Sequence, residues 1–409
     1  MSAARIQVRG SAVGAAARTN WVRAGAALFG AAWGSNQFTP MLLVYRQQLG
    51  LSTGTLEALF GVYALGLIPG LLIAGPLSDS RGRRPVIVAS AALSLAGTLS
   101  LVVADHSLAP LFVGRFLTGL GSGAAFGAGT AWLRELSRPP FGDAGDHTAA
   151  RRAAVTMTIG FAVGPLVAGV LAQWAPDPSV VPYLPHALLM LGVLALVSGA
   201  PETVVRGGGA GTIGRALPSL RQPRFYKVVA PMAPWVFAAP AVAFALLPSV
   251  VVATHATDGI ALTAVVATVT AMAGVLIQPV ARRLDAQAAG NRAATLGLAV
   301  VVAGLVLSAF TVHEHRTWLL VPSAIVLGMG YGLCLVAGLV EVQRLAHPEA
   351  LAGLTAIYYV LTYIGFAVPF VLALAAHLTG YATLLLVTAG LALVTAVWVR
   401  LQARAPTPA

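Results

Sequence analysis

Long apolar runs separated by short polar breaks constrain this chain more than any other feature. Residues 353–376, for example, contain no Asp, Glu, Lys or Arg. About 20 apolar residues are enough for one helix to cross a bilayer. The whole chain of 409 residues is 58% hydrophobic and 9% charged, and its mean hydropathy is +0.83. This composition excludes a soluble domain and predicts an all-α integral membrane protein.

Scanning for such runs between charged or Pro/Gly breaks predicts twelve transmembrane helices. Their approximate ranges are 21–45, 55–77, 85–104, 108–133, 153–174, 183–200, 226–253, 259–281, 292–312, 318–341, 353–376 and 381–401. An even number of spans places both termini on the same side of the membrane.

The positive charges support this count and orient the chain. Of the 25 Lys and Arg, all except Arg46, Arg115 and Arg316 fall in the N-terminal segment, within or at the edges of alternate loops beginning with 78–84, or at the C-terminal end. Because cytoplasmic loops retain Lys and Arg, both termini are predicted to be cytoplasmic. The net charge of +12 therefore indicates orientation and no nucleic-acid partner. Abundant Arg and Ala with almost no Lys are typical of a GC-rich bacterial genome, so we expect a multi-pass protein of the bacterial inner membrane.

The domain organisation follows from one unusual connection. The segment 202–225 is Gly-rich, basic and central in the chain, so it is predicted to be a cytoplasmic linker. No apolar core of a signal peptide precedes the first span. The predicted parts are a disordered cytoplasmic tail over 1–20, a six-helix bundle over 21–201, the linker, a second six-helix bundle over 226–401, and a cytoplasmic tail over 402–409.

The two predicted bundles repeat parts of their sequence. "GFAVGP" at 160–165 recurs as "GFAVP" at 365–369, and a Gly-x-Gly-x-Gly pattern at 119–123 recurs at 328–332. Two parallel repeats related by an axis along the membrane normal are typical of transporters that alternate access by rocking two bundles.

The turn "GPLSDSRGRRP" at residues 75–85 concentrates charge in a chain with little of it. It resembles the signature loop between helices two and three of the major facilitator superfamily. This resemblance implies the major facilitator fold over the whole chain, with two pseudo-symmetric six-helix bundles. It also implies that the loop is a latch that holds one conformation; the alternative is an anchor for topology only. The latch residues are Gly75, Asp79, Arg81, Gly82, Arg83 and Arg84, of which the two glycines are expected to permit a tight turn and close approach of helices. The family usually has Arg where this chain has Ser80, so the arginine that pairs with Asp79 stays open.

Two further motifs resemble the same family. Arg115 begins a pattern similar to the membrane-embedded arginine motif, and such a charge is costly inside a span unless it has a partner; snorkelling to the interface is the alternative. The second motif resembles that of members that export substrates in exchange for protons. Its packing and hinge residues are Gly160, Gly164, Pro165 and Gly169; small-residue packing alone is the alternative.

Proton coupling needs a titratable group within the membrane. Besides Arg115, the candidates are Glu341 and Glu135, at matching inner ends of two spans, and Glu57, near an outer end. For Glu341 an ion pair with Arg344 is the alternative, and for Glu57 a helix-start position favoured by the helix dipole. His186 is a further candidate.

Polar and aromatic residues within the spans are candidates for the substrate cavity. Asn36 and Gln37 interrupt an apolar run and must face the protein interior, where Asn36 and Arg115 have similar predicted depth. The aromatic candidates, for which core packing is the alternative, are Tyr63, Trp235, Tyr331, Tyr358, Tyr359 and Tyr363.

These features predict a secondary active transporter that exports a small lipophilic or amphipathic molecule by proton antiport. Its expected partners are that substrate, protons and the bilayer, and the protein is expected to be a monomer. A facilitator or proton symporter that imports a small metabolite is the alternative. We expect no enzyme, cofactor or metal site: the histidines of the His313-Glu314-His315 run lack the helical spacing of a zinc protease, and no phosphate-binding Gly-Lys-Ser/Thr motif occurs.

Overall fold

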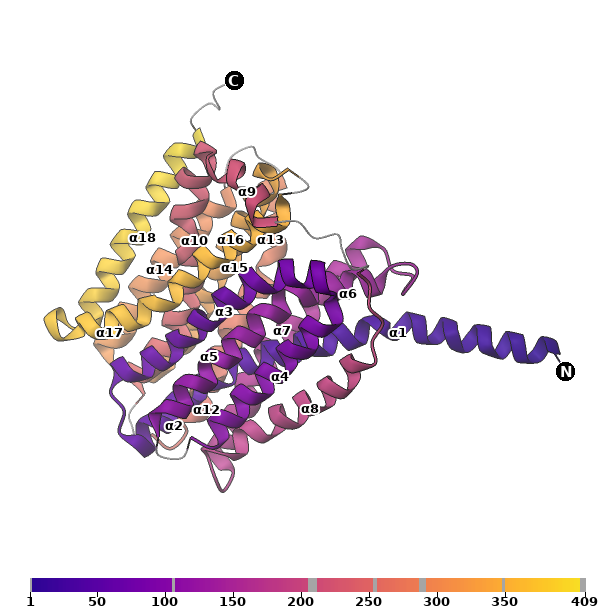
Figure 1. Ribbon diagram of the computed structural model, residues 1–409. Helices are drawn as coiled ribbons and strands as arrows, with labels where there is room; N and C mark the ends of the chain where they lie inside the picture. The colour runs from indigo at the N-terminus through magenta and orange to yellow at the C-terminus, as the bar shows by residue number, and fades with distance from the viewer. Residues whose placement is uncertain are drawn as a thin grey trace. The chain divides into compact units, whose positions relative to one another are not determined.

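The computed structural model describes residues 2–104, 107–204, 212–252, 256–286, 292–347 and 350–404, and the described part is helical without β-strands. Side chains are described for these residues except 2–18, 146, 147, 212–215, 285, 286, 352, 403 and 404. The expected all-α membrane fold is therefore confirmed (Figure 1).

The helices group into two compact units, each built from three segments of the chain. Unit 1 comprises residues 1–35, 65–164 and 183–210, and unit 2 comprises 36–64, 165–182 and 211–409. The predicted bundles over 21–201 and 226–401 are a different division, which stays a prediction.

Among the described residues, unit 1 contains four complete helices and one π-helical turn, which are α4 (Arg83–Val102), α5 (Leu108–Ala124), η1 (Ala125–Gly129), α6 (Thr130–Ser137) and α8 (Leu184–Ser198). It also contains α1 (Ser2–Asn36) as far as Ser35, α3 (Thr53–Arg81) from Leu65 onward, α7 (Asp146–Trp174) as far as Gly164, and the last residue of η2 (Val181–Tyr183).

Unit 2 contains α2 (Phe38–Leu49) and the remaining parts of α3 and α7. Its other elements are α9 (Thr212–Leu220), η3 (Phe225–Val229), α10 (Ala230–Ala241), η4 (Val242–Leu246), α11 (Leu247–Val251), α12 (Gly259–Leu276), α13 (Gln278–Ala286), α14 (Arg292–Glu314), η5 (Thr317–Leu319), α15 (Leu320–Leu345), α16 (Leu351–Tyr363), η6 (Ile364–Ala367), α17 (Val368–Thr379) and α18 (Tyr381–Arg404).

Ten helices in the described part of the chain are long and apolar enough to cross a membrane. The predicted spans 21–45 and 108–133 are helical but are not among these ten. The first is broken at Gln37, and the other carries Arg115. Outside the spans, α1 starts at Ser2, within the tail 1–20 that was predicted to be disordered. The predicted linker 202–225 contains the helix α9.

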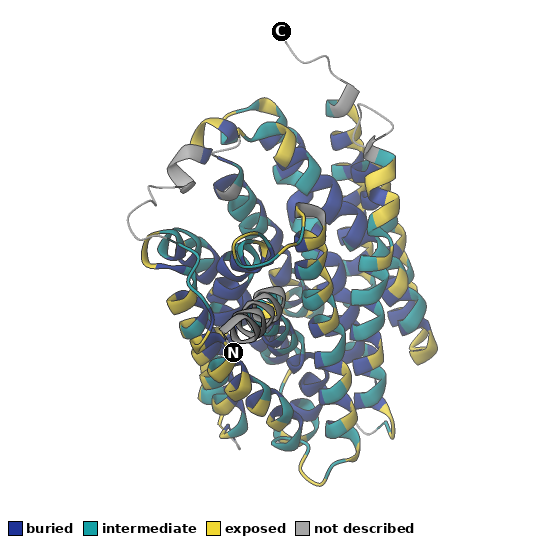
Figure 2. Ribbon diagram, turned by 90° about the vertical axis from the view of Figure 1, so that its right-hand side faces the viewer, coloured by how far each residue is buried: buried dark blue, intermediate teal, exposed yellow. Residues whose placement is uncertain are grey.

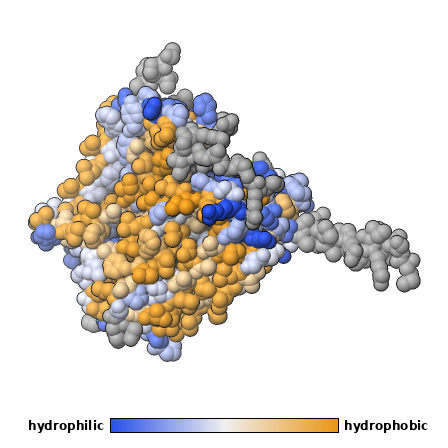
Figure 3. Space-filling view, viewed as in Figure 1, coloured by the Kyte–Doolittle hydropathy of each residue, from blue (hydrophilic) through white to orange (hydrophobic). Residues whose placement is uncertain are grey.

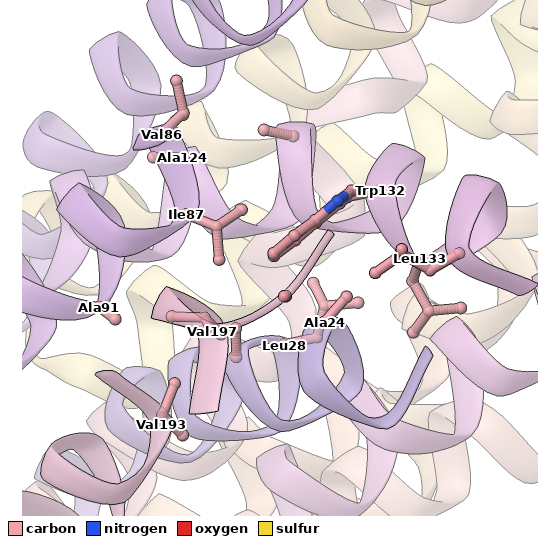
Figure 4. Packing of buried hydrophobic residues seen from close by; sticks show 14 of the residues in the cluster. Ala24, Leu28, Val86, Ile87, Ala91, Ala124, Trp132, Leu133, Val193 and Val197 are labelled. Atoms are coloured by element: carbon pink, nitrogen blue, oxygen red, sulfur yellow. The ribbon is translucent and has the colours of Figure 1, made fainter. Parts of the chain in front are cut away.

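The core of unit 1 forms around one tryptophan. Trp132 of α6 is fully buried, and Figure 4 shows Leu28, Ile87 and Val197 around it. Its Nε1 donates a hydrogen bond to the carbonyl oxygen of Pro201. Burying a large ring and satisfying its N–H fixes α6 against α1, α4 and α8.

Apolar side chains also cover the surface, as a bilayer requires. In unit 2, α18 exposes Leu391 and Val394, and in unit 1, α3 exposes Leu65 and Ile73. Figure 2 marks such exposed positions on the ribbon, and Figure 3 shows hydrophobic residues spread over the visible face. A soluble domain would not expose contiguous apolar surface on this scale.

The repeated glycines allow close packing between helices in both parts of the sequence. A Cβ on Gly121 of α5 would collide with the backbone of α4, and one on Gly330 of α15 would collide with α14. Similarly, Gly164 of α7 touches the backbone of α1, and Gly365 touches that of α10. Each motif therefore packs onto the corresponding helix of its own half, which is the geometry of an internal repeat.

Candidate functional site

The charged turn between α3 and α4 folds around Gly82, which has φ 106°. Only glycine adopts this conformation without strain. The structure also answers which arginine pairs with Asp79: the guanidinium of Arg83 forms an ion pair with Asp79 and lies 3.0 Å from Glu135 Oε1. Arg81 is exposed and makes no ion pair with the described residues.

Gly75 differs from our expectation. We predicted that this glycine allows close approach of helices, but a Cβ at Gly75 would meet nothing within 4 Å. Close approach in this region belongs to Gly82, whose Cβ would clash with the carboxylate of Glu202.

Sequence reasoning did not assign a role to Glu202. Its carboxylate accepts hydrogen bonds from the backbone N–H groups of Arg83 (2.8 Å) and Arg84 (3.0 Å), the first two residues of α4. It accepts two more from Thr203 and Val204. A carboxylate at this place caps the helix and meets its positive dipole end. Partial burial by itself would raise the pKa of Glu202, but the four N–H donors outweigh burial and lower this pKa.

Glu135, the predicted carboxylate at the inner end of α6, belongs to the same cluster. It binds the guanidinium of Arg83 and accepts a hydrogen bond from the hydroxyl of Thr203. The residues Asp79, Arg83, Glu135 and Glu202 therefore form one network of charges, which we call the inner network of unit 1.

Glu341 has a comparable position in unit 2. Its side chain is 3% exposed, and its two oxygens lie 2.6 Å from Arg224 Nε and 2.8 Å from Arg344 Nη1. The hydrogen bond to Glu341 raises the pKa of Arg224, although partial burial of the guanidinium opposes this effect. The geometry favours the ion pair, which was the alternative for Glu341, over a proton carrier.

Arg115 is directed into the protein and does not snorkel. It is 1% exposed, and its Nη1 lies 3.4 Å from the carbonyl oxygen of Ser35. That carbonyl lies two residues before Gln37, where α1 gives way to α2. The Ser35 carbonyl therefore receives the buried charge next to the point where Asn36 and Gln37 interrupt the apolar run.

The predicted cavity aromatics separate into two groups. Tyr63, Tyr331 and Tyr363 join an aromatic cluster in unit 2. Its other members are Phe60, Phe237, Phe244 and Phe366, with the Phe237 and Tyr363 rings stacked at 4.4 Å.

The remaining aromatics pack elsewhere. Trp235 donates to the hydroxyl of Thr395 in α18, and the hydroxyl of Tyr358 lies 3.4 Å from the carbonyl oxygen of Cys334 in α15. The ring of Tyr359 contacts that of Tyr358. For these residues the contacts favour core packing, the alternative that the sequence left open.

The glycines of the predicted hinge motif each make a close contact within their own unit. Gly160 and Gly164 lie against the backbone of α1 in unit 1, whereas Gly169, beyond Pro165, lies against Ala264 of α12 in unit 2.

His186, the remaining titratable candidate, is fully buried in unit 1. Its ring lies between the hydroxyl of Thr98 (2.8 Å) and the carbonyl oxygen of Gly30 (3.0 Å). Both ring nitrogens are therefore satisfied within unit 1.

Glu57 is the one predicted carboxylate without an arginine partner among the residues described. It is 0% exposed in α3, its Oε1 lies 3.1 Å from the hydroxyl of Ser249, and its Oε2 makes no hydrogen bond. The N-terminus of α3 is capped instead by Ser52, whose Oγ accepts from the N–H of Thr55. Ser52 therefore occupies the cap position, and Glu57 lies about one turn into the helix.

Comparison with known proteins agrees with these features. The profile of the Major Facilitator Superfamily matches residues 24–369. A "Multidrug resistance protein MdtL" of Klebsiella pneumoniae (strain 342) is 35% identical over 89 residues, and one of Escherichia coli O45:K1 (strain S88 / ExPEC) is 37% identical over 87 residues. Each match spans about a fifth of the chain (22% and 21%) and 22% of the relative.

Solved transporters share the fold over nearly the whole chain. A POT family transporter in complex with 5-aminolevulinic acid has a TM-score of 0.76 and 13% identity, and the match covers 94% of this chain and 96% of that transporter. The nucleoside transporter NupG has a TM-score of 0.72 and 14% identity, and the match covers 95% of this chain and 100% of NupG. At these identities the likeness shows the fold alone.

Proposed function

Since the chain belongs to the major facilitator superfamily, we propose that it is a secondary active transporter of the bacterial inner membrane that exports a lipophilic or amphipathic molecule in exchange for protons. As a member of that family it is a multi-pass transporter and not an enzyme. The proposal adds the direction, the coupling ion, the substrate class, a monomeric state and cytoplasmic termini.

The observation that carries the proposal is the burial of Arg115. A cation inside a span costs about 2.5–3.5 kcal/mol on insertion scales and is retained where it serves a pathway. Here its Nη1 lies 3.4 Å from the backbone carbonyl oxygen of Ser35, beside the interruption at Gln37. The aromatic cluster of unit 2 supports an apolar or amphipathic substrate, because its rings provide large contact surfaces with few polar handles.

The relatives named for multidrug resistance favour export over import. The importing alternative takes its support from the peptide and nucleoside transporters among the structural neighbours, which share the fold at low identity. We therefore keep a facilitator or proton symporter as the second candidate.

Proton movement into liposomes tests the proposal. Purified protein is reconstituted with an internal pH dye, an inward proton gradient is imposed, and cationic and neutral lipophilic compounds are added in turn. We expect compound-dependent proton entry in the wild type and its loss in Arg115→Ala. The matched control is Arg134→Ala, which removes an exposed arginine of α6 and should keep the activity.

One further variant tests the proton carrier, and one outcome separates the two candidate functions. Because Glu341 is held by two arginines, we expect Glu341→Gln to retain coupled proton entry. If no compound moves protons and the protein instead takes up a metabolite without a gradient, the importing candidate replaces the exporter.

A further inference from the structure

The carboxyl group of Glu57 is buried in unit 2 in a way that an ionised carboxylate does not tolerate. It is fully buried, one of its oxygens has no hydrogen-bond partner, and no cation pairs with it among the described residues. The crevice beside it is lined by Arg46, Leu56 and Ser249. A carboxylate that is fully buried and has no cation bonded to it is poorly stabilised as a charge, and the group protonates instead.

The single hydroxyl proton of Ser249 also indicates that Glu57 is protonated. Its hydroxyl lies 2.8 Å from the carbonyl oxygen of Leu246 and 3.1 Å from Glu57 Oε1. A serine hydroxyl has one proton to donate, and a carbonyl oxygen can only accept. If Ser249 donates to Leu246, the proton between Ser249 and Glu57 has to come from the carboxyl group. A protonated Glu57 therefore satisfies all three groups at once.

The charged and titratable groups around Glu57 come from two other elements. Arg46 of α2 donates to the backbone carbonyl of Ser249 and not to Glu57. Tyr381 of α18 bonds to Thr53 and lies within electrostatic reach of both Glu57 and Arg46. The neighbouring part of α11 contributes the neutral Ser249. Arg46 is thus the one cation in this cluster that could pair with Glu57 after it loses its proton.

We propose that Glu57, Ser249 and Arg46 form a proton-binding clasp at the end of unit 2 that is predicted to face outside. With a proton on Glu57, both Glu57 and Arg46 are bonded to Ser249 and hold the start of α3 and the end of α2 against α11. When the proton leaves, the carboxylate pairs with Arg46, both bonds to Ser249 are lost, and α11 is released. The π-helical turn η4 directly before α11 gives this segment an irregular backbone, as is frequent at functional sites.

The clasp identifies Glu57 as the carboxyl group at which an external proton enters. Its part in transport rests on the proposed function. The closed clasp requires the proton, so proton binding from outside and closure of this end are the same event. Neither Glu135 nor Glu341 could act in this way, because each is already paired with arginine.

Distances between spin labels at this end of unit 2 test the clasp. Gln48 of α2 and Asp258, just before α12, are exposed and are replaced by cysteine for labelling. Cys334, the single native cysteine, is buried and is changed to alanine in the background. Pulsed electron resonance then gives the distance distribution in detergent between pH 5 and pH 9, with no substrate and no gradient.

In the wild type we expect the short-distance population to increase as the pH falls, with a transition of one proton. Glu57→Gln, which keeps the shape and donor capacity of the protonated acid, should hold the short distance at every pH. Glu314→Gln is the matched control, since it neutralises an exposed carboxylate at the same predicted side and should keep the wild-type transition.

Ser249→Ala is a second variant, which leaves the carboxyl group in place. It should reduce the short-distance population severalfold and move the transition to lower pH, because it removes the partner of the protonated form. A pH-independent distribution in the wild type, or an unchanged transition in Glu57→Gln, overturns the clasp. A transition that depends on Glu57 in a protein that moves no protons in liposomes would retain the clasp and reject the antiport proposal.

Discussion

At the scale of the residue, the fate of each carboxylate depends on the partner that the fold brings to it. Glu135 and Glu341 occupy corresponding ends of α6 and α15, and each lies against arginine. Glu202 lies against backbone N–H groups, and Glu57 against a single hydroxyl. Four residues of one chemical type therefore have three different roles, two as ion-pair partners, one as a helix cap and one as a proton-binding group.

The cap at Glu202 has a definite pH dependence. Its folded-state pKa is lowered, so its contribution is complete above the pKa of an unfolded glutamate and is lost as the pH falls through the folded value. We expect Glu202→Ala to reduce the free energy of unfolding by about 1 kcal/mol at pH 7, the typical cost of removing a helix cap.

Unfolding in detergent, followed at several pH values, checks this prediction. The difference between the wild type and Glu202→Ala should shrink as the pH is lowered below about 4, the usual range of a glutamate. Glu314→Ala, at an exposed position, is the control and should change little at any pH. A difference that grows in acid would contradict the capping role.

At the scale of the element, the glycines decide how closely helices pack. A Cβ on Gly332 of α15 would overlap the carbonyl oxygen of Gly274 in α12, and Gly123 of α5 has the corresponding relation to Leu67 in α3. Such contacts need glycine because two backbones touch there. Gly75, in contrast, has open space around it although it belongs to the sequence motif.

The two kinds of glycine predict opposite effects of the same substitution. Gly332→Ala should destabilise the protein by about 1–3 kcal/mol, as overpacking does in other cores. Gly75→Ala should be neutral or stabilising by up to about 1 kcal/mol, because alanine favours a helix interior. Thermal unfolding of both variants in the same detergent measures the contrast. Equal effects of the two substitutions would show that backbone contact is not what sets the cost.

At the scale of the whole molecule, orientation in the membrane rests on the distribution of arginine. Cytoplasmic retention of these charges predicts that the end carrying Gln48 faces outside and that the turn at Ser80 faces the cytoplasm. Both side chains are exposed, so a cysteine at either position can react with a labelling reagent.

Labelling in intact cells checks this orientation. In the Cys334→Ala background, we expect Gln48→Cys to react with a membrane-impermeant maleimide, and Ser80→Cys to react only after the cells are opened. Reaction of Ser80→Cys in intact cells would reverse the topology, and with it the side from which a proton reaches Glu57.

The sequence by itself determined that this chain crosses the membrane many times and belongs to a repeated helical fold. The bilayer imposes a local requirement, about 20 apolar residues per span, and that requirement is visible in the order of residues. The polar residues within the spans were visible too, but the sequence left snorkelling open for Arg115 and predicted 21–45 as one continuous span, which the structure interrupts at Gln37.

Only the tertiary structure decided which groups meet. Glu57 and Ser249 are 192 residues apart, and Arg83 and Glu202 are 119 apart, so no spacing rule could pair them. The sequence likewise could not distinguish Gly75 from Gly332, or Trp235 from Tyr363, because a residue's neighbours across helices depend on how the helices are rotated and packed. Charge pairing and close packing are short-range interactions, and they are specified only when distant segments are brought together in the folded protein.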